Sequence, residues 1–211
     1  MINYSKVLTP GIQAVPESSI KEFFDIINEM PEAISLGLGE PDFVTPEHIR
    51  KAGAASLLEG HTKYTQNPGL PELRGAIAGY LNARFSLNYE PEDEILVTVG
   101  GSEAIDLAIR CLIGPGDEII VPSPTFVCYG PLATVCGGVV KEVVVRAENG
   151  FRITAEQVRA AITPRTKLLV LPYPSNPTGA ILERQDLEEI AAVLQDTDIV
   201  VLCDEIYSEL T

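Results

Sequence analysis

The sequence predicts an α/β fold with a largely parallel sheet, and two features of its 211 residues carry this prediction. Its second half contains short apolar runs without polar alternation, which is typical of strands that are buried on both faces. Helical patterns lie between several of these runs, and strands that alternate with helices imply right-handed crossovers and parallel pairing. Hydrophobic residues make up 45% of the chain, which supplies one sizeable core and excludes a disordered chain.

Helices are expected in the first part of the chain. The segment from Ser19 to Met30 has helical apolar spacing and begins with a capping box of Ser19 and Glu22. The run Ile34–Leu38 is short, apolar and flanked by glycine. A second helix is expected to open at 45–47, with Pro46 at its first position. A third follows Pro71 and has one apolar face, formed by Leu73, Ile77, Tyr80 and Leu81.

Strands are expected from Glu94 onward. The apolar runs that predict them are Ile95–Val99, Glu118–Val121, Val139–Val145, Lys167–Leu171 and Asp198–Cys203. Three helices are expected between them. An apolar stripe indicates the first of them, formed by Ile105, Ala108, Ile109 and Leu112. The capping sequence Thr154–Gln157 indicates the second. A second apolar stripe indicates the third, formed by Leu187, Ile190, Ala191 and Leu194.

The charge of the chain excludes some partners. Fifteen basic and thirty acidic residues give a net charge of −15, which argues against nucleic acid and anionic membranes as partners. The four cysteines are far apart, so neither a disulfide nor a metal site is expected. The first residues lack the apolar segment of a signal peptide, and no apolar run is long enough to span a bilayer. A cytoplasmic protein is therefore expected.

Ligands of parallel α/β sheets bind beyond the carboxyl ends of the strands, so the residues that follow each strand are the candidates. The run Ile95–Val99 leads into Gly100, Gly101 and Ser102 at the start of a helix. Such a start can hold an anion through free N–H groups and the helix dipole. Alternatively, the glycines only turn the chain and Ser102 is an N-cap.

Three other strand ends carry an aromatic ring, an amide and an acid. Phe126 could stack on a planar ligand or pack in the core. Asn176 lies in a proline-rich loop, either as a turn residue or as an amide held in one orientation. Asp204 ends an apolar strand, where it needs a cationic partner unless it faces solvent. Together the four ends describe the phosphate, ring face, phenolic oxygen and pyridinium nitrogen of pyridoxal phosphate.

The motifs also occur in the order of a known family. They are Leu36–Phe43, Lys63–Thr65 with Gly69–Arg74, Gly100–Ala104, Asn176–Gly179 and Asp204–Tyr207. From Pro16 to Thr211 the sequence resembles the class I/II aminotransferases of the aspartate aminotransferase type, a group of fold-type I enzymes that use pyridoxal phosphate. The resemblance implies the three-layer α/β/α fold of that group. It also implies transfer of an amino group between an L-amino acid and a 2-oxo acid by a homodimer.

The resemblance assigns the cofactor contacts by position. Gly100, Gly101 and Ser102 correspond to the loop that holds the cofactor phosphate, and Phe126 corresponds to the aromatic over the pyridine ring. Asp204 corresponds to the acid that keeps the ring nitrogen protonated.

Four further positions are assigned in the same way. Asn176 and Tyr207 correspond to the pair that forms hydrogen bonds with the oxygen on the cofactor ring. Tyr64 corresponds to the tyrosine that reaches the other subunit's cofactor phosphate. Gly39, together with Asn176, corresponds to the position beside the substrate carboxylate.

The resemblance also implies what lies outside these 211 residues. The family's Schiff-base lysine and the arginine for the substrate carboxylate are expected beyond Thr211, so no catalytic residue is expected within the chain. The strands that would join Ile95–Val99 to the sheet, and the C-terminal small domain, are expected there too. Residues 1–45 are then an N-terminal segment and residues 46–211 an incomplete cofactor-binding large domain. We expect this chain alone to be inactive; the alternatives are another fold-type I enzyme, such as a C–S β-lyase or a synthase, and a non-catalytic remnant.

Overall fold

The computed structural model describes residues 2–16, 26, 29, 30, 32, 34, 39 and 43–211. Most of the expected helix from Ser19 to Met30, and most of the run Ile34–Leu38, lie outside the described residues. The chain forms two compact units. The sheet unit comprises Met1–Pro16 and Val99–Thr211, and the helical unit comprises Glu17–Thr98. Because this division follows internal contacts alone, the predicted boundary after residue 45 stays a prediction.

The helical unit contains α4 (Glu47–Leu58) and α5 (Pro71–Phe85). Pro71 begins α5 as expected, whereas Pro46 is the N-cap of α4 and not its first helical residue. This placement leaves both prolines where a missing N–H costs no intrahelical hydrogen bond. Within α5, Arg74 is buried, and its Nη1 atom donates to the carbonyl oxygens of Pro91 (2.7 Å) and Glu92 (3.1 Å). The guanidinium therefore ties the helix to the loop that follows it.

The segment Ile95–Val99 is not a strand, so this prediction is wrong. The N–H group of Val97 donates to the carbonyl of Pro68, at 3.0 Å, in a loop of the same unit. Thr98 is the last residue of the helical unit, and Val99 is the first of the long segment of the sheet unit. A strand needs a hydrogen-bonded neighbour along its length, and the apolar pattern of this segment does not supply one.

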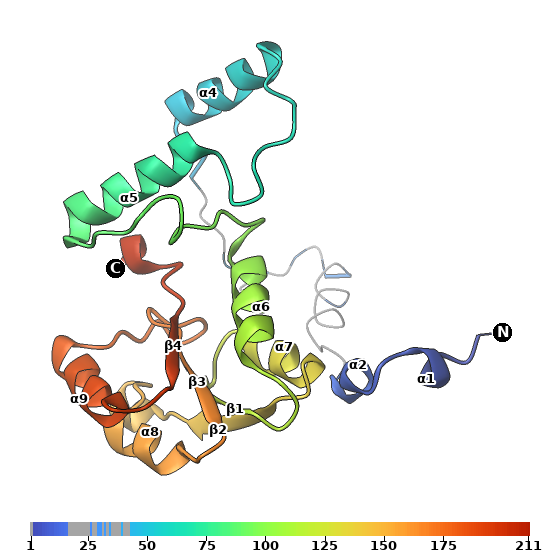
Figure 1. The fold of residues 1–211 in the computed structure, drawn as a ribbon, viewed down its shortest axis with the longest axis vertical. Coiled ribbons are helices and arrows are strands. Elements are labelled where there is room, and N and C mark those ends of the chain that lie inside the picture. Colours follow the sequence, from blue (N-terminus) through green and yellow to red (C-terminus); the bar gives the residue numbers. More distant parts are fainter. Residues whose placement is uncertain are drawn as a thin grey trace. The chain divides into compact units, whose positions relative to one another are not determined.

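The sheet unit contains a four-stranded sheet whose order is β2-β1-β3-β4 (Figure 1). Its strands are β1 (Glu118–Ser123), β2 (Val139–Val144), β3 (Thr166–Leu171) and β4 (Val200–Cys203). All three pairings are parallel, as predicted. The two central strands are almost completely buried, which explains why their sequences show no polar alternation.

Helices cover both faces of this sheet. On one face, α6 (Gly101–Leu112) and α7 (Tyr129–Val135) pack on a core that includes Ile119 and Leu168. On the other face, α8 (Ala155–Ala161) and α9 (Arg184–Leu194) pack on a core that includes Ile120 and Leu169. Successive strand residues thus point to opposite cores, as the two-residue period of a strand requires. Figure 1 shows the sheet between these helix pairs, and the three-layer α/β/α architecture is confirmed.

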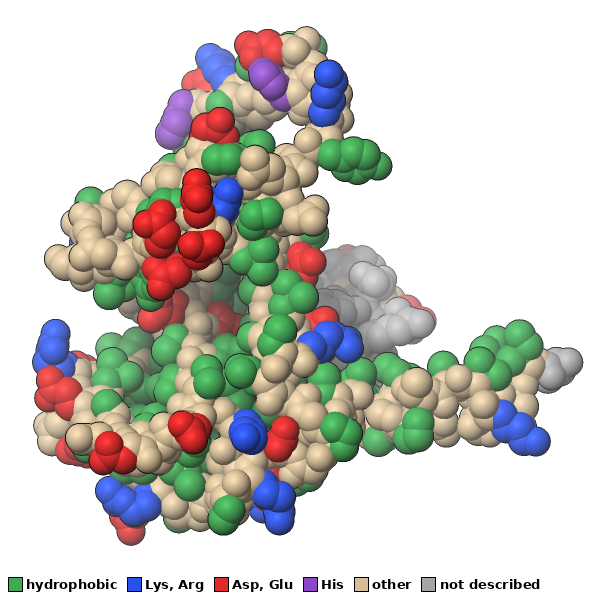
Figure 2. All heavy atoms as spheres, in the orientation of Figure 1, with side chains coloured by type: hydrophobic (Ala, Val, Ile, Leu, Met, Phe, Trp, Pro, Cys, Tyr) green, Lys and Arg blue, Asp and Glu red, His purple; other side chains and the backbone are tan. Residues whose placement is uncertain are grey.

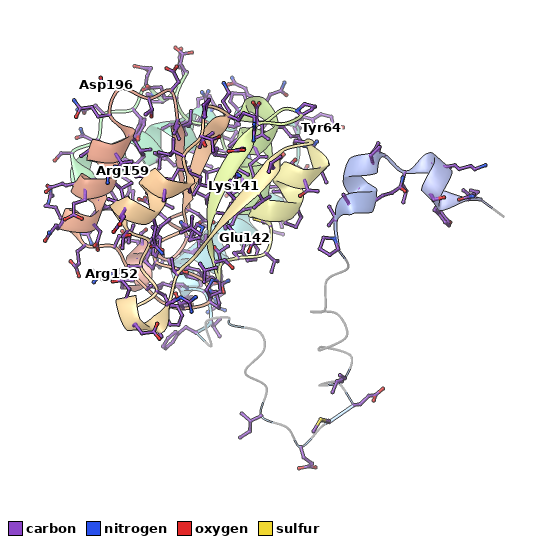
Figure 3. All side chains as sticks on the ribbon, turned by 90° about the horizontal axis from the view of Figure 1, so that it is seen from below. Tyr64, Lys141, Glu142, Arg152, Arg159 and Asp196 are labelled. Atoms are coloured by element: carbon purple, nitrogen blue, oxygen red, sulfur yellow. The ribbon has the colours of Figure 1, made fainter. Side chains whose placement is uncertain are left out.

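Local interactions fix the helices of this unit. Thr154 and Gln157 form the expected capping box at the start of α8. Arg152, labelled in Figure 3, places Nη1 2.9 Å from Oδ2 of Asp186 in α9. The short helices α1 (Tyr4–Val7) and α2 (Pro10–Ala14) lie at the start of the chain, and α2 packs on α7. Two 3-10 turns, η1 (Ala147–Asn149) and η2 (Ser208–Leu210), complete the described elements.

The surface carries the acidic excess of the composition. Acidic side chains are spread over the face that Figure 2 presents, in line with the net charge of −15. Among the helices of the described residues, none combines the length and the apolar character that crossing a membrane would require.

Candidate functional site

A cavity of about 400 Å³ lies at the carboxyl edge of the sheet. Its walls come from the start of α6, the segment after β1, the loop after β3 and the segment after β4. Because parallel strands end at the same edge, segments far apart in the sequence meet here. Six of the predicted cofactor residues line the cavity: Gly101, Ser102, Phe126, Asn176, Asp204 and Tyr207.

The start of α6 forms one wall of the cavity. Gly100 is the N-cap and has a φ of 81°, which glycine adopts without the strain that a side chain would bring. Gly101 and Ser102 are the first two helical residues, so their N–H groups have no intrahelical acceptor. The alternative in which Ser102 is the N-cap is therefore wrong. Its position instead leaves N–H groups and a hydroxyl at the positive end of the helix dipole, where an anion is favoured.

Asp204 follows β4, and hydrogen bonds fix its carboxylate. Its N–H group donates to the carbonyl of Leu171 at 3.2 Å, which continues the pairing of β3 and β4 by one residue. Its Oδ2 atom accepts from the hydroxyl of Tyr129 at 2.7 Å, and its Oδ1 atom accepts from the N–H of Ile206 at 3.2 Å. The side chain lines the cavity and is only partly exposed. The cavity thus contains a carboxylate in a fixed orientation, which is suited to binding a cation.

Tyr129 also lines the cavity, and the sequence did not single it out. Its side chain is 1% exposed, and its ring meets the ring of Phe126 edge to face, with centroids 6.2 Å apart. Burial and the hydrogen bond to Asp204 raise the pKa of Tyr129, so its hydroxyl keeps its proton and acts as a donor. The available signal was its spacing of three residues from Phe126. That signal predicts one helical face but not a hydrogen bond to a residue 75 positions away.

The cysteines near the cavity are poor nucleophiles. Burial raises the pKa of the Cys128 thiol to about 11, and the negative charge of Asp204 acts in the same direction. Partial desolvation and the charge of Glu205 raise the pKa of Cys203, which lines the cavity. Because the thiolate is the reactive form, these thiols are not set up for covalent catalysis near neutral pH.

The loop after β3 presents Asn176 at the cavity. Buried Ser175 donates its N–H to the carbonyl of Ala180 at 2.9 Å and accepts at its own carbonyl from Gly179 at 2.7 Å. The hydroxyl of Thr178 accepts from the N–H of Ala180 at 3.3 Å. These bonds hold the backbone on both sides of Asn176, whose side chain is exposed. The loop therefore suits an amide that must keep one orientation.

Three predicted residues are not among the cavity-lining residues. Gly100 directly precedes the cavity wall as the N-cap of α6. Tyr64 belongs to the helical unit, and its side chain, labelled in Figure 3, is fully exposed. Gly39 is exposed, and a Cβ built on it would meet no atom within 4 Å. The roles expected for these three residues stay predictions.

Comparison with known proteins gives a consistent picture. Residues 31–211 match the family described as Aminotransferase class I and II. The chain is 44% identical to the aspartate/prephenate aminotransferase of Thermus thermophilus, over 85% of this chain and 46% of that protein. It is 40% identical to the aspartate aminotransferase of Pyrococcus abyssi, over 95% of this chain and 51% of that protein.

Solved structures agree with these sequence matches. The crystal structure of the aspartate aminotransferase from Rhizobium meliloti superposes with a TM-score of 0.90 at 36% identity, over 95% of this chain and 51% of that one. The chain spans about half the length of the curated relatives that it matches. Since the family match covers residues 31–211 of 211, the chain belongs to the class I and II aminotransferases.

Proposed function

We propose that the protein to which this chain belongs is a pyridoxal-phosphate-dependent aminotransferase, which moves an amino group between an L-amino acid and a 2-oxo acid. One observation carries the proposal. Ser102, Asn176 and Asp204 come from three separate segments, and all three line one cavity at the carboxyl edge of the sheet. The aminotransferase names of the sequence relatives support the same reaction class.

The residues of the cavity fit this cofactor. A volume of about 400 Å³ is within the range of small-molecule sites. The start of α6 offers donors for a phosphate, and Phe126 offers an aromatic face for a flat ring. Each oxygen of Asp204 accepts one hydrogen bond from the described residues, which leaves lone pairs for a protonated ring nitrogen.

Each of these groups has a distinct task in the proposed reaction. When bound, pyridoxal phosphate supplies an electron sink for the bonding electrons of the substrate α-carbon. Asp204 would keep the ring nitrogen protonated, because a carboxylate beside a cation favours its charged form. Gly101 and Ser102 would hold the phosphate, and Asn176 and Tyr207 would donate to the ring oxygen.

The proposal also covers residues outside the cavity wall. Gly100 would let the backbone approach the phosphate closely, and Gly39 would lie beside the substrate carboxylate together with Asn176. Tyr64 would reach the cofactor of a second subunit in a homodimer, for which its fully exposed side chain is suited.

We propose that the base that moves the α-proton lies in the part of the protein that corresponds to the uncovered half of the relatives. Within the part of the chain that the structure describes, no lysine lines the cavity. The chain's own residues would therefore bind and orient the cofactor, and a lysine from the other half of the protein would transfer the proton.

The test uses the complete protein and a panel of L-amino acids with 2-oxoglutarate, and it measures amino-acid and 2-oxo-acid products by chromatography. We expect amino-group transfer, which Asp204→Ala reduces by at least about 100-fold, on the scale of a lost electrostatic contact to the reacting group. Cofactor binding through the phosphate should persist in this variant. The matched control is Asp198→Ala, an exposed acid just before β4, which should leave the rate unchanged.

Two outcomes would contradict the proposal. An Asp204→Ala variant that keeps most of the wild-type rate would show that Asp204 is not the partner of the ring nitrogen. Products of elimination, such as a free thiol with ammonia, in place of an exchanged amino group would assign the protein to the lyases.

A further inference from the structure

We infer that Tyr129 is a positioning residue that sets the orientation of both Asp204 and Phe126 against the cofactor. The inference rests on the proposed function and deepens it. A single side chain would then control two of the contacts to the pyridine ring, namely the acid at its nitrogen and the aromatic over its face.

The hydroxyl of Tyr129 holds the acid. It donates to Oδ2 of Asp204 at 2.7 Å, and this bond joins the start of α7 to the end of β4. The second bond to the carboxylate, from the N–H of Ile206 to Oδ1, is longer at 3.2 Å and comes from the neighbouring backbone. Without the hydroxyl, this local bond would be the one hydrogen bond from the described residues that restrains the carboxylate.

The ring of Tyr129 supports the aromatic. It meets the ring of Phe126 with an interplanar angle of 80° and centroids 6.2 Å apart, which is a favourable edge-to-face arrangement. Phe126 itself is 36% exposed and lines the cavity, so part of its surface is open to a ligand while Tyr129 contacts its ring.

Helix hydrogen bonding and core packing hold Tyr129 in place. It is the first residue of α7, and the N–H of Leu132 bonds back to the carbonyl of Cys128 at 3.1 Å. Tyr129 and Ala133 both belong to the core between this helix and the sheet. A side chain anchored in this way keeps one rotamer, as the support of a binding residue requires.

The protonation of the pair favours the same role. Burial raises the pKa of Tyr129, and the bond to Asp204 adds to this effect, so the proton stays on the hydroxyl. The bond therefore runs from a neutral hydroxyl donor to an oxygen of Asp204.

The test compares two ligands on the full chain by isothermal titration calorimetry. One is pyridoxal phosphate, and the other is its 1-deaza analogue, which has carbon in place of the ring nitrogen. Wild type should prefer pyridoxal phosphate. Tyr129→Phe should lose about tenfold of this preference, the scale of one hydrogen bond to a charged group. The variant should bind the deaza analogue within about twofold of wild type, because its ring still supports Phe126.

Two further variants complete the design. Tyr129→Leu removes the supporting ring as well and should weaken the binding of both ligands. The matched control is Tyr173→Phe, because the Tyr173 hydroxyl bonds to the backbone of Phe151 and Ile153 and the residue does not line the cavity. This control should leave the preference unchanged.

The outcomes separate the inference from the function on which it rests. If wild type prefers pyridoxal phosphate and Tyr129→Phe keeps that preference, the positioning role is refuted and the proposed function stands. If wild type binds both ligands equally, the assignment of Asp204 to the ring nitrogen fails, and the inference fails with it. If wild type binds neither ligand, the proposed cofactor itself is contradicted.

Discussion

Arg165 and Glu118 form an ion pair in which Nη2 lies 2.6 Å from Oε1. Glu118 is the first residue of β1 and its side chain is completely buried. Its other oxygen, Oε2, accepts from the hydroxyl of Thr163 at 2.6 Å, and Nζ of Lys141 lies 3.6 Å from Oε1. The acid therefore lies at the amino end of a central strand, and it is partnered there by two cations and a hydroxyl.

This cluster predicts that the stability of the fold falls in acid. The hydrogen bond from Thr163 lowers the pKa of Glu118 below its ordinary value of 4.5, and Arg165 and Lys141 add to the effect against the opposing cost of burial. The unfolded chain then takes up its proton at a higher pH than the folded one. The stabilisation is complete above about pH 4.5 and is lost as the pH falls below that value. Urea denaturation midpoints between about pH 3 and 7 measure this loss.

Substitution tests the assignment to Glu118. Glu118→Gln should be less stable than wild type at pH 7, and its denaturation midpoint should change less between pH 5 and pH 3. Glu142→Gln, at an exposed position of the neighbouring strand β2 (Figure 3), should keep the wild-type pH profile. If the denaturation midpoints of wild type and Glu118→Gln fell in parallel with pH, Glu118 would not be the cause of the acid sensitivity.

The sheet shows which features of the fold local sequence can predict. The apolar runs of β1 and β3 were predictable because burial on both faces removes polar alternation, and burial at these positions is what the structure shows. Ile95–Val99 has the same pattern but forms no strand. The difference lies in the hydrogen-bonded neighbour, which depends on segments distant in the sequence and leaves no mark on the run itself.

The residues of the site show the same difference between what local sequence predicts and what depends on distant contacts. Asn176 and Asp204 could be predicted because the parallel strands β3 and β4 bring their following residues to one edge, and both line the cavity. Gly101 and Ser102 line the cavity too, although the segment before them is not a strand. The importance of Tyr129 could not be predicted from its local sequence. It depends on a contact with Asp204, 75 residues away, and only the packing of α7 on the sheet creates that contact.

Ser102→Ala should weaken the binding of pyridoxal phosphate about tenfold, because the hydroxyl at the start of α6 would donate to a charged phosphate oxygen. Pyridoxal, which lacks the phosphate, should bind wild type and variant equally. Titration calorimetry on the full chain measures both affinities. Ser56→Ala, on the surface of α4, is the control and should change neither affinity. An equal loss for both ligands would point to a disturbed fold and not to a lost phosphate contact.

Ile109→Ala should lower the free energy of unfolding by about 2–5 kcal/mol, because the substitution leaves a cavity in the core between α6 and the sheet. Ile109 is 0% exposed. Leu107 lies on the same helix but is 37% exposed, so Leu107→Ala should cost less than about 1 kcal/mol. Urea titration of the two variants measures both changes. Equal losses would mean that the two helix faces are buried to a similar degree.

Gly138→Ala should destabilise the fold, whereas Gly130→Ala should not. A Cβ on Gly138 would lie 3.1 Å from the carbonyl oxygen of Ala133 and in clash with the Cγ2 methyl group of Ile113, which is itself buried. Neither neighbour can move freely, so overpacking should cost about 1–3 kcal/mol. A Cβ on Gly130 would meet its nearest neighbour, Cγ2 of Val140, at an ordinary 3.9 Å.

Comparing the two substitutions therefore distinguishes the cost of steric crowding in the folded state from the effect of reduced entropy in the unfolded chain. Neither has a positive φ, so alanine fits the backbone at both positions. With no clash, Gly130→Ala should raise stability by about 0.4–1 kcal/mol, because alanine reduces the freedom of the unfolded chain. Thermal denaturation of the two variants beside wild type decides the matter. A Gly138→Ala protein at least as stable as wild type would show that the turn before β2 relaxes at no cost, against the close packing found here.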